Sequence, residues 1–287
     1  MAPAKKKQNK YRPYYSDYYK SFRRFILPIS LILGILGYGL YYVMGSFSFV
    51  VIIPLTLALL LYLLLEVVHQ VSLIMGNHYQ FGIQQAQSIQ AIYSILKPEL
   101  PLPSMAKWAG NPDFCQLVAK QILTSSPGVI LEFGSGASTI VAGLALRRTW
   151  GKLISIDHDN KFGTETAVEI QCHNLSDFVQ VLHCPLTEVT VDSNTYLWYD
   201  LSLLGEIPTI DLLIIDGPPS GIQKHSRYPA LPMLYDKLAK NAVILLDDGR
   251  RADEQEIVMM WKDRYDDLNV QSIGTEKGAF LLSRSGR

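Results

Sequence analysis

Residues 129–140 read Val-Ile-Leu-Glu-Phe-Gly-Ser-Gly-Ala-Ser-Thr-Ile, and this stretch decides the fold. Three apolar residues, an acid, and then two glycines among small residues predict a buried strand that turns sharply into a helix. Glycine at positions 134 and 136 lets the backbone approach a ligand that a Cβ atom would hold away. The stretch therefore predicts a ligand at the end of the first strand of an α/β domain.

A second predicted strand, residues 152–156, follows about twenty residues later and ends in Asp157. An acid at the tip of the second strand suits the two hydroxyl groups of a ribose. We therefore expect an adenosine-containing cofactor. The residues expected to contact this cofactor are Glu132, Gly134, Ser135, Gly136, Asp157 and His158.

The glycine motif separates two cofactor classes. Dinucleotide-binding domains carry G-x-G-x-x-G, whereas Thr139 stands at the third glycine position here. The acid-x-Gly-x-Gly pattern of Glu132, Gly134 and Gly136 resembles motif I of class I S-adenosylmethionine-dependent methyltransferases. That resemblance implies S-adenosyl-L-methionine as cofactor, and its cationic sulfonium and amino acid end are compatible with an acid near the loop.

The later apolar runs extend the same pattern. Each is followed by a helical or turn segment, which predicts a Rossmann-like, doubly wound, mainly parallel sheet covered on both faces. The resemblance to class I methyltransferases covers roughly residues 102–284. We expect strands over 178–183, 210–216 and 242–248 and a terminal pair over 270–273 and 278–282, with helices over 232–240 and 252–265.

Three carboxylates, Asp216, Asp247 and Asp248, end the fourth and fifth predicted strands. Carboxylates that meet at one sheet edge repel each other unless protons, basic partners or a cation compensate. Oxygen ligands favour a hard ion such as Mg²⁺ or Mn²⁺. The pattern resembles the metal sites of catechol O-methyltransferases and of metal-dependent sugar O-methyltransferases, which implies that these three residues hold an ion. Helix capping, pairing with Arg250 and Arg251, and direct use as a base are the alternatives.

The general base is a separate question. The catechol enzymes have a lysine where this chain has Pro219, so the resemblance does not identify the general base of this chain. Asp216 and His225 are the catalytic candidates, because histidine accepts a proton near neutral pH. A solvent-exposed loop histidine is the alternative for His225. Arg227 and the pair Arg250-Arg251 are candidate ligands for a phosphate or carboxylate of the substrate, with ordinary surface charge as the alternative.

The N-terminal third predicts a membrane anchor. Residues 25–44 and 47–65 are apolar and free of charge, and each is about 30 Å long as a helix. Only two residues separate them, so we expect a tight transmembrane hairpin. A buried helical hairpin of a soluble protein is the alternative, and a signal peptide fits poorly because the second apolar segment follows at once.

Charge predicts the orientation of this hairpin. Eight lysines and arginines precede the first span and none lies in the turn. The positive-inside rule therefore places both termini in the cytoplasm and the protein in the cell membrane with two spans. Tyrosines at helical spacing among these cations suggest a helix in the headgroup region, with a disordered basic arm as the alternative for the first ten residues.

Four regions follow from these patterns. We expect a basic, aromatic cytosolic arm over 1–24, the hairpin over 25–68, a connecting helix and linker over 69–101, and the catalytic domain over 102–287. One apolar face of the connecting helix predicts packing on its own domain, a docking contact or a homodimer contact.

The chain has no net charge, and the basic N-terminus leaves the rest acidic, so nucleic-acid binding is not expected. Three cysteines without paired spacing predict reduced thiols and no zinc site.

Together these features predict a membrane-anchored, S-adenosylmethionine-dependent methyltransferase. We expect a metal-assisted O-methylation, and the anchor favours a membrane-associated saccharide, lipid-linked glycan or lipid head group as acceptor. An aminopropyl transferase of the spermidine-synthase type shares the fold and is the alternative within enzymes. A non-catalytic membrane scaffold with a vestigial cofactor fold is the alternative from another class.

Overall fold

The computed structural model describes residues 31–32, 34–39, 41–105 and 110–284. The chain divides into two compact units, residues 1–80 and 81–287. The predicted basic arm over 1–24 and the start of the first predicted span lie outside the described residues.

A seven-stranded sheet forms the centre of the second unit, and the order of its strands is β3-β2-β1-β6-β7-β9-β8. The first five strands are parallel, and the last two run antiparallel to their neighbours. The sheet confirms the prediction of a mainly parallel α/β fold with a terminal strand pair. The strands are β1 Val129–Phe133, β2 Lys152–Asp157, β3 Val179–His183, β6 Ile210–Ile215, β7 Leu238–Leu246, β8 Leu268–Ile273 and β9 Ala279–Arg284.

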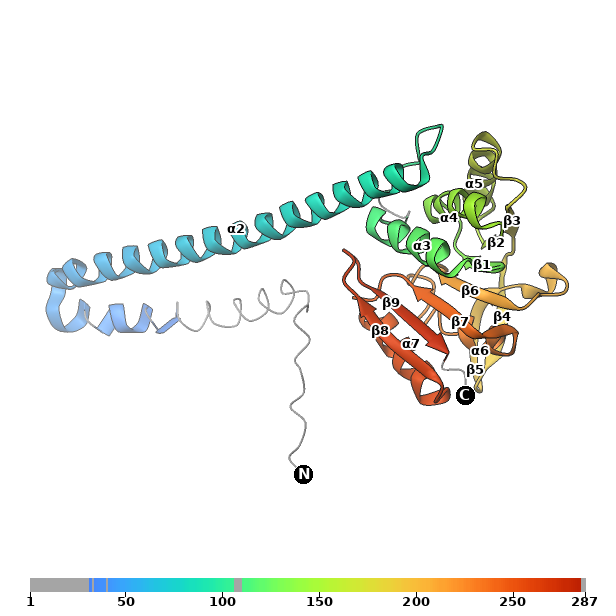
Figure 1. Ribbon diagram of the computed structural model, residues 1–287. Helices are drawn as coiled ribbons and strands as arrows, with labels where there is room; N and C mark the ends of the chain where they lie inside the picture. Colours follow the sequence, from blue (N-terminus) through green and yellow to red (C-terminus); the bar gives the residue numbers. More distant parts are fainter. Residues whose placement is uncertain (1–30, 33, 40, 106–109, 285–287) are drawn as a thin grey trace, which may run out of the picture. The chain divides into compact units, whose positions relative to one another are not determined.

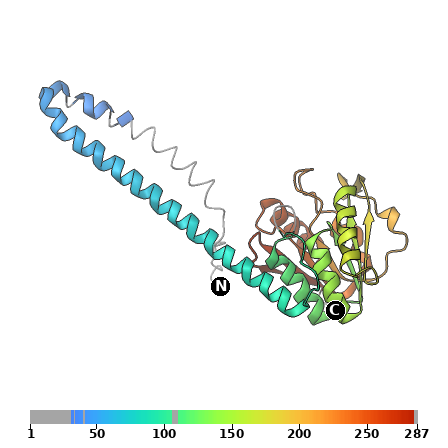
Figure 2. The ribbon, with the colours of Figure 1, turned by 90° about the horizontal axis from the view of Figure 1, so that it is seen from above.

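Helices cover both faces of this sheet because its strands are apolar on both sides (Figures 1 and 2). Alternate residues of a strand point to opposite faces, and in β1 Ile130 and Leu131 accordingly belong to two different core clusters. One face packs against α3 (Pro112–Ser125), α4 (Ala137–Thr149) and α5 (Asn160–Cys172). The other packs against α6 (Ala230–Leu234), α7 (Ala252–Arg264) and strand β5 (Asn194–Tyr199).

Two elements differ from the sequence prediction. The predicted helix over 232–240 is wrong: α6 ends at Leu234, a short 3₁₀ helix covers Tyr235–Lys237, and β7 already begins at Leu238. Leu238 pairs with Ile210 of β6, so sheet pairing prevails over the local helical pattern. The antiparallel hairpin of β4 (Leu186–Val191) and β5 was not predicted.

The first unit contains a long apolar helix. Helical residues precede a 3₁₀ turn at Gly45–Phe47, and α2 then runs over Ser48–Leu96. One helical stretch, Gly34–Leu96, is long and apolar enough to cross a membrane, and its most apolar window has a mean hydropathy of 2.7 and is 6% buried. The two-span prediction is not confirmed by this finding.

Contacts across the 3₁₀ turn nevertheless bring residues far apart in sequence close together. The rings of Tyr41 and Phe49 lie 5.9 Å apart, and a Cβ atom placed on Gly37 would lie 3.6 Å from Cδ1 of Ile52. Residues 37 and 52 of one straight helix would lie about 22 Å apart along its axis. The chain therefore turns back at Gly45, whose φ of +56° is the left-handed conformation that glycine adopts without strain.

Candidate cofactor cavity and acidic cluster

A cavity of about 860 Å³ lies at the carboxyl ends of the central parallel strands. This edge is where open α/β sheets bind ligands. The glycine turn after β1 and the start of α4 form part of its wall, together with Asp157 and His158 after β2. The wall also includes Asp216, Gly217, Arg227, Asp248, Arg251 and Lys277.

The glycine turn is built for close backbone approach. Gly134 has φ +91°, and a Cβ atom there would lie 3.0 Å from the backbone carbon of Asp216. A Cβ atom on Gly217 would in turn lie 3.1 Å from the Gly134 backbone. The ends of β1 and β6 therefore touch through two glycines. Gly136 differs, since its Cβ would meet nothing within 4 Å.

Asp157 links the second strand to the glycine turn. Its Oδ2 accepts hydrogen bonds from the backbone N–H (2.9 Å) and the hydroxyl (2.8 Å) of Ser135. Its Oδ1 accepts one from the backbone of Asp159 (2.9 Å) and lies 3.5 Å from Nδ1 of His158. Asp157 thus stands at the cavity wall where the sequence predicted it, and a ribose there would compete with Ser135 for Oδ2.

Glu132 lies behind the turn, and it is absent from the cavity wall described above. Its side chain is completely buried, and it accepts hydrogen bonds from the hydroxyls of Ser138 (2.7 Å), Thr139 (2.6 Å) and Ser155 (2.7 Å). Burial raises the pKa of this carboxyl, which the three hydroxyls partly oppose. Glu132 therefore ties β1 to α4 and β2, and direct contact with a cofactor stays a prediction.

The structure brings the three predicted metal ligands together. One carboxylate oxygen from each of Asp216, Asp247 and Asp248 lies within 4.8 Å of the others. Asp247 and Asp248 are buried, and neither carboxylate oxygen of Asp247 has a hydrogen-bond partner among the described residues. Burial raises the pKa of Asp216 to about 7, and burial with repulsion from Asp216 raises that of Asp247 well above its ordinary value.

Arg227 is the main basic partner of this cluster. Its buried guanidinium donates to Oδ2 of Asp248 (2.9 Å) and to the backbone oxygens of Asp216 (3.0 Å) and Asp247 (3.1 Å). Arg251 lies 2.7 Å from Asp248, so part of the predicted ion pairing with basic residues is present. Arg227 was predicted as a substrate ligand, and in the described structure its contacts are to the protein.

The charges of the cluster do not balance by these contacts alone. Glu254, also fully buried, lies 3.8 Å from Arg227 and 3.4 Å from Arg251. Four carboxylates thus meet three cations, the two guanidinium groups and the Lys277 ammonium, whose charge lowers the pKa of Asp216; an excess of one negative charge remains when all are ionised. A proton or a cation would compensate this excess. The unpartnered oxygens of Asp247 and the all-oxygen donor set fit a hard cation.

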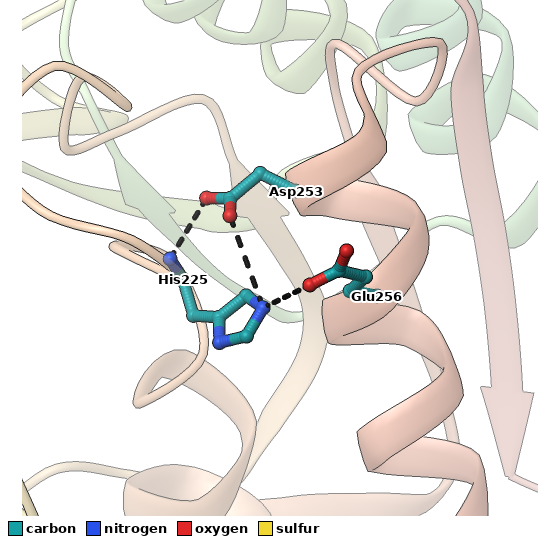
Figure 3. A group of neighbouring side chains, drawn as sticks. All are labelled: His225, Asp253 and Glu256. Atoms are coloured by element: carbon teal, nitrogen blue, oxygen red, sulfur yellow. Dashed lines mark hydrogen bonds and ion pairs between the residues drawn. The ribbon is translucent and has the colours of Figure 1, made fainter.

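His225 lies outside the residues that form the cavity wall. Its Nε2 lies 2.8 Å from Oε2 of Glu256 and 3.8 Å from Oδ1 of Asp253, both on α7, and its backbone N–H donates to Asp253 (Figure 3). Lys224 also pairs with Glu256 at 2.9 Å. These contacts connect the loop of His225 to the start of α7. The geometry lends no support to His225 as the general base, and its catalytic role stays a prediction.

Sequence reasoning did not single out two residues of the site. Tyr199 comes from the unpredicted β4–β5 hairpin, and Lys277 comes from the loop between β8 and β9. No short motif marks either residue, since tertiary packing alone brings them to the cavity wall.

Comparison with known proteins agrees with this fold. Residues 131–249 match a family model described as a methyltransferase domain. No curated protein matches the chain.

Solved structures of similar fold include methyltransferases from three organisms. The O-methyltransferase of Bacillus cereus in complex with SAH is 16% identical, with a TM-score of 0.48 over 70% of this chain and 90% of that one. TomG of Streptomyces achromogenes with SAM is 17% identical (TM-score 0.48; 70% and 89%). SAH-bound PaMTH1 of Podospora anserina is 14% identical (TM-score 0.49; 69% and 88%).

The match covers the strand ends that carry the glycine turn, Asp157 and the acidic cluster. The sequence prediction of a methyltransferase is therefore confirmed at the level of the domain: residues 131–249 form a methyltransferase domain.

Proposed function

We propose that this protein is a membrane-anchored O-methyltransferase that uses S-adenosyl-L-methionine and a divalent cation. The observation that carries the proposal is one cavity whose wall includes both the glycine turn with Asp157 and the acids Asp216 and Asp248. The glycine turn with Asp157 suits an adenosine cofactor. Asp216 and Asp248 suit a cation and a hydroxyl acceptor. The related solved O-methyltransferases contain SAM or SAH, which agrees with this cofactor.

The acidic cluster supports the metal-assisted form of the reaction. When bound, Mg²⁺ or Mn²⁺ would be held by Asp216, Asp247 and Asp248, and it would lower the pKa of the acceptor hydroxyl. Arg227, which is buried, holds Asp248 and the ends of strands β6 and β7 in position. Asp157 and the Ser135 turn orient the cofactor on the other side of the cavity.

The membrane part of the proposal is a two-span hairpin over residues 25–68 with both termini in the cytoplasm. The apolar character of the first unit and the close approach of Ile52 to Gly37 support it. The cluster of N-terminal cations supports the orientation. An anchor of this kind favours an acceptor in the same membrane, and we propose a saccharide or lipid-linked glycan.

The test uses the full chain purified in detergent, with methyl-labelled S-adenosylmethionine and a lipid extract of the native membrane. We expect label to enter the lipid fraction with Mg²⁺ or Mn²⁺ and to stop with a chelator. The label should survive alkali, because methyl ethers resist alkaline hydrolysis and methyl esters do not. Asp236→Asn, an exposed acid outside the cavity wall, is the matched control for Asp247→Asn.

Each part of the proposal can fail separately. If the label is lost in alkali, the methyl acceptor is a carboxylate and not a hydroxyl. If turnover is unchanged in excess chelator, no metal takes part in the reaction, and Asp216 is the group that accepts the proton. Transfer of an aminopropyl group from decarboxylated S-adenosylmethionine, with no methyl transfer, would favour the spermidine-synthase alternative.

A further inference from the structure

Tyr199 ends β5 with its side chain completely buried, and its hydroxyl has no hydrogen-bond partner among the described residues. Burying a hydroxyl without a partner costs about 1–3 kcal/mol, and buried tyrosines usually find one. Tyr228, which is 3% exposed, illustrates the usual case, because its hydroxyl donates to Asp192 at 2.6 Å. The hydroxyl of Tyr199 therefore calls for a partner that the described residues do not supply.

The position of Tyr199 indicates where that partner would come from. The residue forms part of the cavity wall. A Cβ atom on Gly217 would lie 2.3 Å from its hydroxyl oxygen, so the hydroxyl lies against the backbone where β1 and β6 end. Asp157 and Asp216 both act on it electrostatically. The predicted ribose ligand Asp157 and one acid of the cluster, Asp216, are therefore both near enough to the hydroxyl to affect it.

The ring of Tyr199 is held in place by aromatic neighbours. Its centroid lies 5.0 Å from the rings of Phe133 and Trp198 and 6.0 Å from that of His158. A side chain locked in this way presents its oxygen at a fixed point, which is what a positioning group requires. Burial, with the charge of Asp157, raises the pKa of Tyr199 well above its ordinary value, so the hydroxyl stays protonated at neutral pH and is no base.

The charges around the hydroxyl indicate the kind of group it faces. Two carboxylates, Asp157 and Asp216, raise the cost of negative charge there, and Arg227 alone among the named neighbours lowers it. Surroundings in which acidic neighbours outnumber basic ones favour a cation. In the cofactor of the proposed function the cationic group is the sulfonium, which the product S-adenosylhomocysteine lacks.

We propose that the Tyr199 hydroxyl oxygen contacts the cationic sulfonium end of bound S-adenosylmethionine and makes the protein prefer this cofactor over S-adenosylhomocysteine. The inference rests on the proposed function and adds to it a residue that positions the reacting end of the cofactor. A preference for the charged cofactor over its neutral product also aids product release after each transfer.

The test is calorimetric binding of both ligands to the full chain in detergent with a chelator present, for the wild type, Tyr199→Phe and Tyr228→Phe. Tyr199→Phe should raise the Kd of S-adenosylmethionine at least about fivefold and that of S-adenosylhomocysteine less than about twofold, the size of one lost polar contact. Its melting temperature should equal or exceed that of the wild type, because the hydroxyl has no hydrogen-bond partner among the described residues. Tyr228→Phe should melt lower and keep the wild-type ratio of the two affinities.

The outcomes separate the inference from the function it rests on. If the wild type binds neither ligand, the proposed function fails. If the wild type binds both and Tyr199→Phe changes both affinities equally, or neither, the contact with the sulfonium is wrong. A lower melting temperature for Tyr199→Phe would show that the hydroxyl already has a partner in the free protein, which would also overturn the inference.

Discussion

Asp247 carries two buried carboxylate oxygens without a hydrogen-bond partner among the described residues. A buried charge without such partners is costly unless a proton or a cation compensates it. Its burial raises its pKa, and the same burial would strengthen its attraction to a cation. At the scale of one residue, the features that destabilise the free protein are those that a metal site requires.

Asp247→Asn should therefore separate stability from activity. In a chelator the variant should melt several degrees above the wild type, because it no longer buries a carboxyl that must be kept protonated or charged without a partner. Its methyl transfer with Mg²⁺ should fall more than about a hundredfold, because the cation loses a ligand. Differential scanning fluorimetry and the labelled-methyl assay measure the two effects. A variant with wild-type turnover would contradict the metal assignment.

Glu132 predicts a pH dependence of stability. Because burial raises its pKa in the folded protein, the folded state keeps a proton that the unfolded chain releases. The stability from this group is present below the ordinary glutamate pKa of about 4.3, and it is lost as the pH rises through the folded value. Above about pH 4, the melting temperature of Glu132→Gln should therefore change less with pH than that of the wild type. Parallel pH profiles for both proteins would contradict this account.

The turn between β1 and α4 is the element that most directly shapes the cavity. Gly134→Ala forces a Cβ atom to within 3.0–3.1 Å of the backbone of Asp216 and Gly217 at a φ of +91°. Strain of this kind costs about 1–3 kcal/mol, so the variant should unfold at lower urea concentration. Gly136→Ala is the matched control, since nothing lies within 4 Å of its Cβ position. Equal urea midpoints for the two variants would contradict the close approach of β1 and β6.

The elements that the sequence predicted are those with strong local signals. The strands that end at Phe133, Asp157 and Ile215 are apolar runs that end in an acid or are followed by an acid or glycine, and all three were predicted. The β4–β5 hairpin was missed because its strands are only partly buried and contain polar residues, and because its turn at Asp192-Ser193 contains neither glycine nor proline. The segment from Leu238 was misassigned because its partner strand, which lies far away in sequence, decides its conformation.

The site follows the same division. The sequence placed Asp216, Asp247 and Asp248 together because parallel strands end at one edge. It could not find the role of Arg227, because a buried arginine is recognisable only from its contacts. It could not separate Glu132, which lies behind the turn, from Ser135, which lies at the cavity wall.

The whole molecule combines an apolar helical unit with a methyltransferase domain, and its topology can be tested directly. A reporter that is active only in the cytosol should function at either terminus if residues 25–44 and 47–65 both span the membrane. Replacing Lys5, Lys6, Lys7 and Lys10 by glutamine should weaken that orientation. A C-terminal reporter active only on the opposite side would show that the chain crosses an odd number of times.

The most direct test of the central claim is calorimetric titration of the full chain in detergent with S-adenosylhomocysteine and, separately, with NAD. The account predicts micromolar binding of S-adenosylhomocysteine, about −8 kcal/mol, and none of NAD. Asp157→Ala should weaken this binding at least about tenfold by removing charge-assisted bonds to the ribose, while Asp236→Ala should not. Tight binding of NAD without binding of S-adenosylhomocysteine would contradict the account.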